Sequence, residues 1–119
     1  MTPDAAVERL QGTLAHLWMA RTFLKHADEI QDDEELLDVP RTLFDCIRAV
    51  EPAALRNDNK EYLHRLKGKL PKLRRAAELF QREFRRVSAH TNFEMAALSL
   101  TASVRQIEEI LAALPSSPA

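Results

Sequence analysis

The chain has 119 residues, of which 45% are hydrophobic and 29% charged, and its 17 basic and 18 acidic side chains leave a net charge of −1. This length suits one domain, residues 1–119, with a core large enough to fold without disulfides or metals. The near-neutral total excludes a protein recruited to nucleic acid by its bulk charge, and the single cysteine, Cys46, excludes an internal disulfide and favours a reducing compartment.

Composition favours helix along the whole chain. Only two glycines occur, among many Ala, Leu, Glu, Arg and Lys residues, which are strong helix formers. No apolar stretch approaches the roughly 20 residues of a membrane-spanning helix. The first ten residues also lack the basic start and apolar run of a secretory signal. We therefore expect an all-α, cytoplasmic protein with no membrane partner.

The first expected helix begins at Thr2, a favourable N-cap, with Pro3 at its first position. Its apolar residues fall on two nearly opposite faces, one with Val7, Leu10, Leu14, Leu17 and Leu24, the other with His16, Met19, Phe23, His26 and Ile30. A helix that is apolar almost all round is central in its domain or shared with a second subunit. We therefore expect His16 and His26 in the core or in an interface, and a homodimer through this helix is one interpretation.

A second helix is expected over residues 33–50, where Leu36, Leu43, Ile47 and Val50 keep one register. Pro40 lies inside this pattern, so the segment is either one kinked helix or a helix that starts again near Asp38. The pair Glu51-Pro52 is expected to end it.

The third helix is expected to start at Asp58, which forms a capping-box pattern with Glu61. Apolar residues then recur at 3/4 spacing at Leu63, Leu66, Leu70, Leu73, Ala77, Phe80, Phe84 and Val87. The register survives Gly68 and Pro71, which favours one long, kinked helix over a break at Pro71.

The fourth helix is expected from Thr91, with Glu94 completing another capping box, to Leu114 before Pro115. Its apolar stripe contains Phe93, Ala97, Leu100, Val104, Ile107 and Leu111. Four long helices with short connections predict an antiparallel up-down-up-down four-helix bundle.

Charge is distributed unevenly between two segments. Residues 28–38 carry seven acids, whereas residues 60–86 carry ten bases against three acids. The two segments can be solvated faces that attract each other across the bundle. The alternative is that the basic segment forms a face for an acidic partner protein.

Several chemistries lack their sequence patterns. There is no Gly-x-Ser-x-Gly elbow, glycine-rich phosphate loop or His-Glu-x-x-His motif. A di-iron site in a bundle needs Glu-x-x-His on two helices, which this sequence does not supply. We therefore expect no metal, no cofactor and no enclosed active site, so a non-enzymatic role is favoured. Cys46 is expected to be a small buried residue.

The stretch YLHRLKGKLPKL, residues 62–73, carries the most specific pattern. At about 100° per residue, His64 and Gly68 lie together on the face opposite the leucines, and Lys67 flanks them. A glycine in a helix costs about 1 kcal/mol relative to alanine, but it bares the backbone for a close partner. A lysine beside the imidazole offers charge to a phosphoryl group.

His64, Leu66, Lys67 and Gly68 resemble the His-x-Leu-Lys-Gly motif of histidine-containing phosphotransfer domains. These are four-helix bundles of about this size that pass a phosphoryl group between receiver-domain aspartates through one exposed histidine. The resemblance implies that His64 is the phosphoacceptor, Lys67 steadies the phosphoryl charge and Gly68 permits docking, with any Mg²⁺ held by the receiver partner. Lys69 stands where that family usually has a small residue.

Two alternatives stay open beside this resemblance. His64 can be an ordinary surface histidine beside a kink, in a non-catalytic helical interaction or oligomerisation protein. The segment Arg85 to His90 also resembles the Arg-x4-His spacing of the HEPN helical ribonucleases, which implies RNA cleavage by Arg85 and His90. The same spacing recurs at Arg21 and His26, so this pattern discriminates little.

Overall fold

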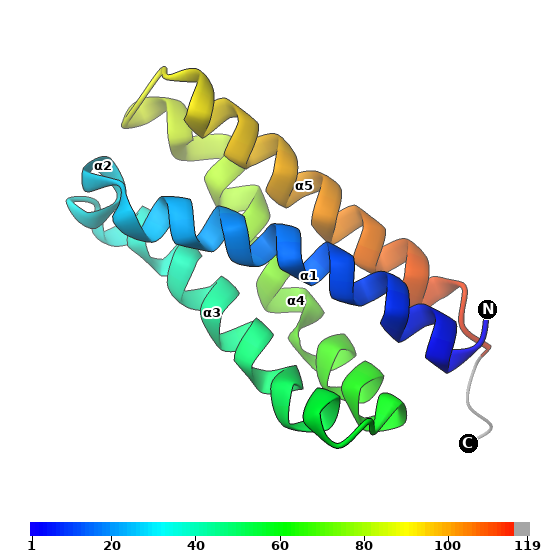
Figure 1. Cartoon of the computed structure of the whole chain (residues 1–119). Coiled ribbons are helices and arrows are strands. Elements are labelled where there is room, and N and C mark those ends of the chain that lie inside the picture. The colour runs from blue at the N-terminus through cyan, green and yellow to red at the C-terminus, as the bar shows by residue number, and fades with distance from the viewer. Residues whose placement is uncertain (116–119) are drawn as a thin grey trace.

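The computed structural model describes residues 1–115, and this part of the chain is an antiparallel bundle of four long helices (Figure 1). They are α1 (Pro3–His26), α3 (Glu34–Leu55), α4 (Asn59–Glu83) and α5 (Thr91–Ala112). Two short elements join them, the single turn α2 (Asp28–Gln31) and the 3₁₀ turn η1 (Phe84–Arg86). The bundle measures 45 × 23 × 23 Å, and the predicted fold class is confirmed.

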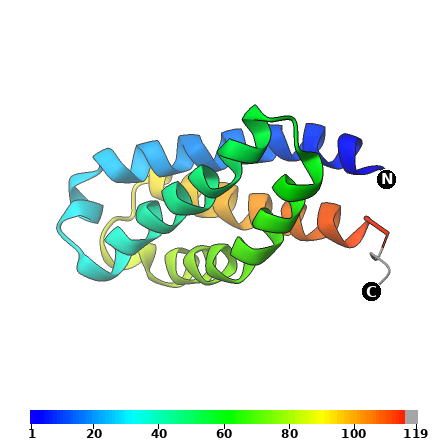
Figure 2. The same cartoon turned by 90° about the horizontal axis from the view of Figure 1, so that it is seen from below.

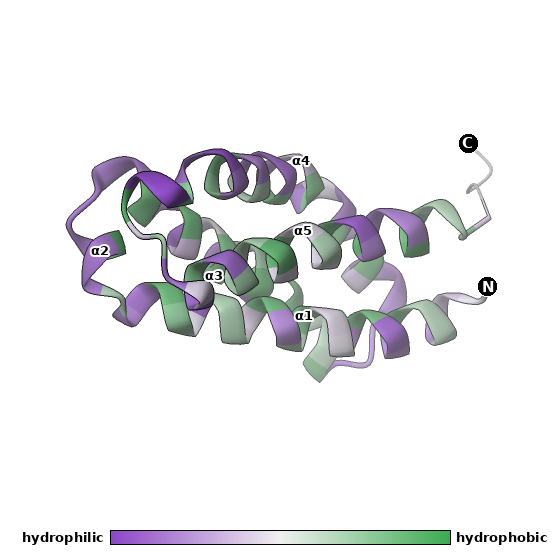
Figure 3. Cartoon of the chain, turned by 90° about the horizontal axis from the view of Figure 1, so that it is seen from above, coloured by the Kyte–Doolittle hydropathy of each residue, from purple (hydrophilic) through white to green (hydrophobic). Residues whose placement is uncertain are grey.

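The helices pack in chain order around one core, because α3 lies between α1 and α4, and α5 lies between α4 and α1. The largest fully buried side chains come from every long helix: Leu10, Leu17, Leu24, Leu36, Leu43, Leu66, Leu73, Phe80, Leu100 and Ile107. Hydrophilic residues cover the outer side of α4, whereas its hydrophobic residues face the other helices (Figure 3). The 3/4 spacing therefore identified the inward face of each helix correctly.

All four long helices have side-chain caps at their starts. Thr2 Oγ1 accepts a hydrogen bond from the Ala5 amide at 3.1 Å, and Asp58 Oδ1 accepts one from the Glu61 amide at 3.1 Å. Both caps confirm the sequence prediction. Asp33 Oδ1 caps α3 in the same way, through the Leu36 amide at 2.9 Å. Each cap satisfies a backbone donor that has no partner within its helix.

The first helix ends earlier than its apolar pattern indicated. Ala27 is extended, with φ −83° and ψ 122°, so α1 stops at His26. The apolar pattern predicts Ile30 on this helix, but Ile30 lies on α2, where its side chain is fully buried. The break at Ala27 turns the chain toward α3, and the side chain of Ile30 enters the core from α2.

The second helix continues past its expected end. Pro52 lies inside α3, which stops only at Leu55, so the expected end at Pro52 is wrong. The proline removes one helical hydrogen bond, the one to the carbonyl of Arg48, and both residues lie on the exposed side of α3. The actual stop is a Schellman motif at Asn57, whose φ is 55°. Asp58 N–H bonds to Ala53 O at 2.9 Å, and Asn57 N–H bonds to Ala54 O at 3.1 Å.

Neither Pro40 nor Pro71 breaks its helix. Pro40 is buried within α3, whereas Pro71 is exposed on α4, which changes direction near the middle of its length (Figure 2). The third expected helix ends sooner than Val87, because α4 tightens into η1 at Phe84. The ring of Phe84 is buried and stacks on Phe80, with centroids 5.6 Å apart.

Candidate functional site

His64, Lys67 and Gly68 form an exposed patch on the outer side of α4, which we call the α4 patch. Leu66 and Leu73 are fully buried on the opposite side of the same helix. The sequence register therefore placed the three residues on the correct face. The patch lies inside a 25-residue helix, so its backbone is helical throughout.

Gly68 has no role in the packing of the fold. A Cβ atom built on it would meet nothing within 4 Å, and its φ is not in the left-handed region. Alanine would therefore fit here and would form a more stable helix. Gly12 on α1 is equally open, so the chain contains a matched second glycine in a helix.

Pro71 adds a second bare backbone group beside Gly68. A proline has no N–H, so it cannot donate to the carbonyl of the residue four positions before it, which is Lys67. Lys67 and Pro71 are both exposed. The α4 patch therefore combines a main-chain carbonyl that receives no hydrogen bond from Pro71 with a glycine that has no side chain. The sequence indicated the kink at Pro71 but not this consequence.

Two cations flank His64 without acidic partners. Lys60 and Lys67 lie four residues before and three residues after it, so both are neighbours on the helix surface. Neither lysine takes part in an ion pair within residues 1–115. Arg65 differs, because its Nε lies 2.7 Å from Glu61 Oε1. The charge around His64 is therefore positive and uncompensated, which suits an anionic group such as a phosphoryl.

The second candidate pair, Arg85 and His90, is engaged in local structure. Arg85 lies over the ring of Phe84, with its Cζ 4.6 Å from the ring centroid. His90 is the N-cap of α5, because its Nδ1 accepts a hydrogen bond from the Asn92 amide at 3.0 Å. The predicted cap at Thr91 is therefore wrong by one residue.

His16 and His26 are both exposed, so the core alternative is wrong for these two histidines, whereas their place in an interface stays a prediction. Neighbouring helices cover the second face of α1 only in part, through Phe23, and they also cover Trp18 beside it. Trp18 packs on Phe44 of α3 at 6.0 Å between centroids, and Phe23 meets Phe93 of α5 edge-on at 5.2 Å. Met19 stays 66% exposed. The homodimer through α1 stays a prediction, with a smaller apolar surface than the sequence suggested.

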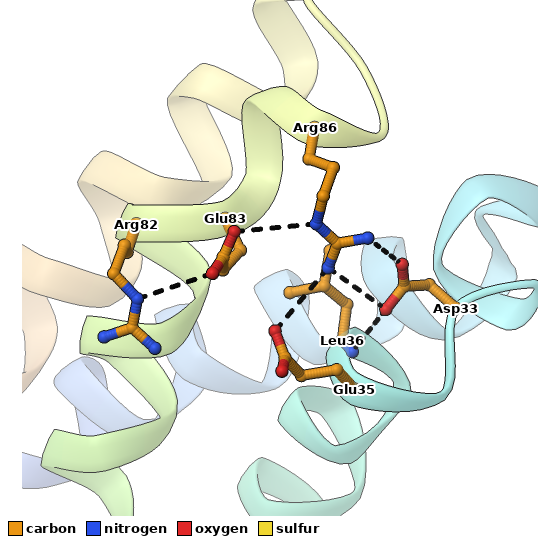
Figure 4. A network of polar contacts seen from close by, with 6 residues as sticks. All are labelled: Asp33, Glu35, Leu36, Arg82, Glu83 and Arg86. Atoms are coloured by element: carbon orange, nitrogen blue, oxygen red, sulfur yellow. Dashed lines mark hydrogen bonds and ion pairs between the residues drawn. The ribbon is translucent and has the colours of Figure 1, made fainter.

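The acidic and basic segments meet at one end of the bundle (Figure 4). The guanidinium of Arg86 binds the carboxylate of Asp33 and lies 3.5 Å from carboxylate oxygens of Glu35 and Glu83. The hydrogen bond from Arg86, followed by that from the Leu36 amide, holds the pKa of Asp33 below its usual value of 3.8. The cluster fixes α3 against η1, so part of the charge asymmetry has a structural role.

Other chemistry is limited in the part of the chain that the structure describes. Among residues 1–115, no three His, Cys, Asp or Glu side chains are grouped so that they could hold a metal ion. None of the helices formed by these residues combines the length and the apolar character needed to span a membrane. Cys46 is buried as predicted, and its burial raises the thiol pKa to about 11, so it is a poor nucleophile at neutral pH.

Comparison of the chain with protein-family models, curated proteins and solved structures gives no significant match. A four-helix bundle supports many unrelated functions, so the fold by itself indicates no activity. The most specific functional indication is therefore the chemistry of the α4 patch.

Proposed function

We propose that the protein is a phosphotransfer module in which His64 accepts a phosphoryl group from an aspartate of a partner protein and passes it on. The observation that carries this proposal is the glycine one turn beyond an exposed histidine. Gly68 weakens the helix and contributes nothing to packing, yet it opens the backbone beside the imidazole. A partner protein that must approach His64 closely would explain why a glycine stands at this position.

The transfer needs little machinery on this chain. The lone pair of the unprotonated imidazole nitrogen attacks the phosphorus of an aspartyl phosphate. The bond between phosphorus and the carboxylate oxygen breaks, and the carboxylate leaves with the electron pair. Lys67 supplies positive charge beside the phosphoryl oxygens, and any Mg²⁺ belongs to the partner. The chain's own task is to hold the ring in an open, ordered position.

The surroundings of His64 support an acidic partner surface. Lys60, Lys67, Lys72 and Arg75 are all exposed on α4, and none of them pairs with a carboxylate within residues 1–115. Unpaired charge of one sign speeds the encounter with a partner of opposite charge. The main-chain acceptor at Lys67 gives such a partner a further point of contact.

Phosphorylation assays test the proposal directly. The protein is incubated with phosphorylated receiver domains, or with phosphoramidate as a small phosphoryl donor, and the label is tested for acid lability and alkali stability. We expect label on wild type and on His16→Gln, since His16 is another exposed histidine on a helix. We expect none on His64→Gln. Label that persists in His64→Gln, or that is absent from wild type, would contradict the proposal.

A second candidate function is a helical interaction protein that self-associates through α1. The observation that favours it is the exposure of Met19, at 66%, on α1, the helix with apolar residues on two nearly opposite faces. Met19→Glu is the appropriate probe, because Phe23 packs on Phe93 and its substitution would disturb the core. Light scattering should show a dimer for wild type and a monomer for Met19→Glu. A wild-type monomer would remove this candidate.

A further inference from the structure

Residues of α1, α2 and α3 line a groove of about 480 Å³. It lies near the end of the bundle where α2 connects α1 to α3, and Figure 1 shows how these three helices are arranged. Its apolar lining comes from Leu37, Pro40 and Phe44 of α3. Leu37 and Phe44 are only half-buried, so their carbon surface is open to a ligand. The volume and the apolar lining match the usual range of small-molecule sites.

The rim of this groove is positively charged. Arg21 and Lys25 line it from α1 and Arg41 from α3, whereas Asp45 is the single acidic side chain among the lining residues. No carboxylate of residues 1–115 forms an ion pair with any of the three cations. An apolar floor with three unpaired cations above it favours a ligand that is both apolar and anionic.

Aromatic rings hold Arg21 in place. Its Cζ lies 4.4 Å from the centroid of Trp18 and 4.9 Å from that of Phe44, which is a cation–π contact with both rings. No carboxylate of residues 1–115 pairs with Arg21, so its N–H groups can donate to an anion. Gln31 closes one end of the groove, where its Nε2 donates to the Lys25 carbonyl at 2.7 Å.

The hollow between α3 and α4 is larger, about 740 Å³, but its lining of mixed charge favours neither an anion nor a cation. Asp38, Asp45 and Glu78 line it together with four basic side chains. The lining of the α1–α3 groove therefore favours an anion more clearly than the lining of this hollow does.

We infer that the α1–α3 groove binds a small amphipathic organic anion. The apolar body lies on Leu37, Pro40 and Phe44, and a carboxylate or phosphate meets Arg21, Lys25 and Arg41. This site is separate from the α4 patch and does not depend on phosphotransfer. Its ligand class follows from the two surfaces together, since neither an apolar alcohol nor an inorganic anion would use both.

Three probes of equal chain length separate the two contributions. Octanoate carries the anion, octanol lacks it, and octyltrimethylammonium reverses the charge. Trp18 is the only tryptophan and lies against Arg21, so its emission reports on the groove, with calorimetry as a second measurement. We expect saturable binding of octanoate. Each exposed cation contributes about two- to fivefold to affinity, so octanol should bind roughly tenfold more weakly and the cationic probe more weakly still.

Substitutions locate the binding. Lys25→Gln and Arg41→Gln should each weaken octanoate about two- to fivefold without altering thermal unfolding, since both side chains are exposed and unpaired. Arg105→Gln, an exposed arginine on α5, serves as the matched control and should bind as wild type does. Three results would overturn the inference: no saturable signal with octanoate, equal affinity for octanol, or unchanged affinity in both groove variants.

Discussion

Replacing each of the two glycines by alanine separates the requirements of the fold from those of a partner. Gly12 and Gly68 both lie inside long helices, and neither has any atom within 4 Å of the position that a Cβ would occupy. Neither has a left-handed φ. If Gly68 exists only to let a partner approach, alanine should stabilise the protein at both positions and impair phosphotransfer at one.

The size of the stabilisation follows from helix propensity. Alanine is favoured over glycine by about 0.5–1 kcal/mol inside a helix, mainly because the unfolded glycine chain has more conformations to lose. For 119 residues, an unfolding entropy of about 2.1 cal/mol/K per residue means that 1 kcal/mol raises Tm by about 4 °C. Each variant should therefore melt about 2–4 °C above wild type.

Thermal and urea unfolding followed by circular dichroism measure this change, and transfer from a phosphorylated receiver domain measures the functional one. We expect Gly12→Ala to transfer phosphate at the wild-type rate and Gly68→Ala to transfer it more slowly, although both are more stable. A Gly68→Ala protein less stable than wild type would refute the assignment of this glycine to the surface. Equal transfer by both variants would refute its role in docking.

Three further predictions concern the cap, the charge cluster and the thiol. His90→Ala should lower the free energy of unfolding by about 1 kcal/mol in urea, because the N-cap of α5 is lost, whereas His90→Asn should retain most of it. The pKa of Asp33 is lower in the folded than in the unfolded state, so its contribution is present above pH 3.8 and is lost as pH falls through the folded value. Arg86→Gln should therefore destabilise the protein at pH 7, and its difference from wild type should shrink below about pH 4; a constant difference would contradict this. Cys46, buried with a thiol pKa of about 11, should react with Ellman's reagent only as fast as the protein opens, and rapid labelling of the native protein at pH 7 would contradict its burial.

The core of the bundle could be predicted from the sequence because apolar residues spaced three and four apart lie on the same face of a helix, and that face is the buried one. Leu66 and Leu73 keep one register through Gly68 and Pro71, and both are fully buried. The caps at Thr2 and Asp58 were equally predictable, since their side chains bond to amides three residues ahead. These features depend on neighbours along one helix.

The ends of helices were less predictable because tertiary contacts decide them. Ala27 has the highest intrinsic helix propensity, yet it ends α1 so that Ile30 can reach the core. Asn57 stops α3 with a left-handed φ, although Pro52 looked like the stronger signal. His90 caps α5 in place of the more usual Thr91, because its imidazole reaches the Asn92 amide.

The candidate sites also differ in whether they depend on one helix or on contacts between helices. The exposure of His64 follows from its angle to the leucines of its own helix, so the sequence predicted it. The groove could not be predicted from one helix, because Trp18 and Phe44 lie 26 positions apart and meet around Arg21 only when α1 packs on α3. Periodicity indicates which face of a helix is buried, but not which side chains of two helices form a shared surface.

The most direct test of the proposed function is to identify the residue that carries the phosphoryl group. After incubation with a phosphorylated receiver domain, the protein is digested at alkaline pH, and mass spectrometry identifies the peptide that carries the phosphoryl group. Together with ³¹P NMR, this distinguishes a phosphohistidine on His64 from one on the other three exposed histidines, His16, His26 and His90. We predict a single acid-labile phosphohistidine at His64, which is lost in His64→Gln and retained in His16→Gln. Phosphate distributed over all four histidines, or none on His64, would contradict the account.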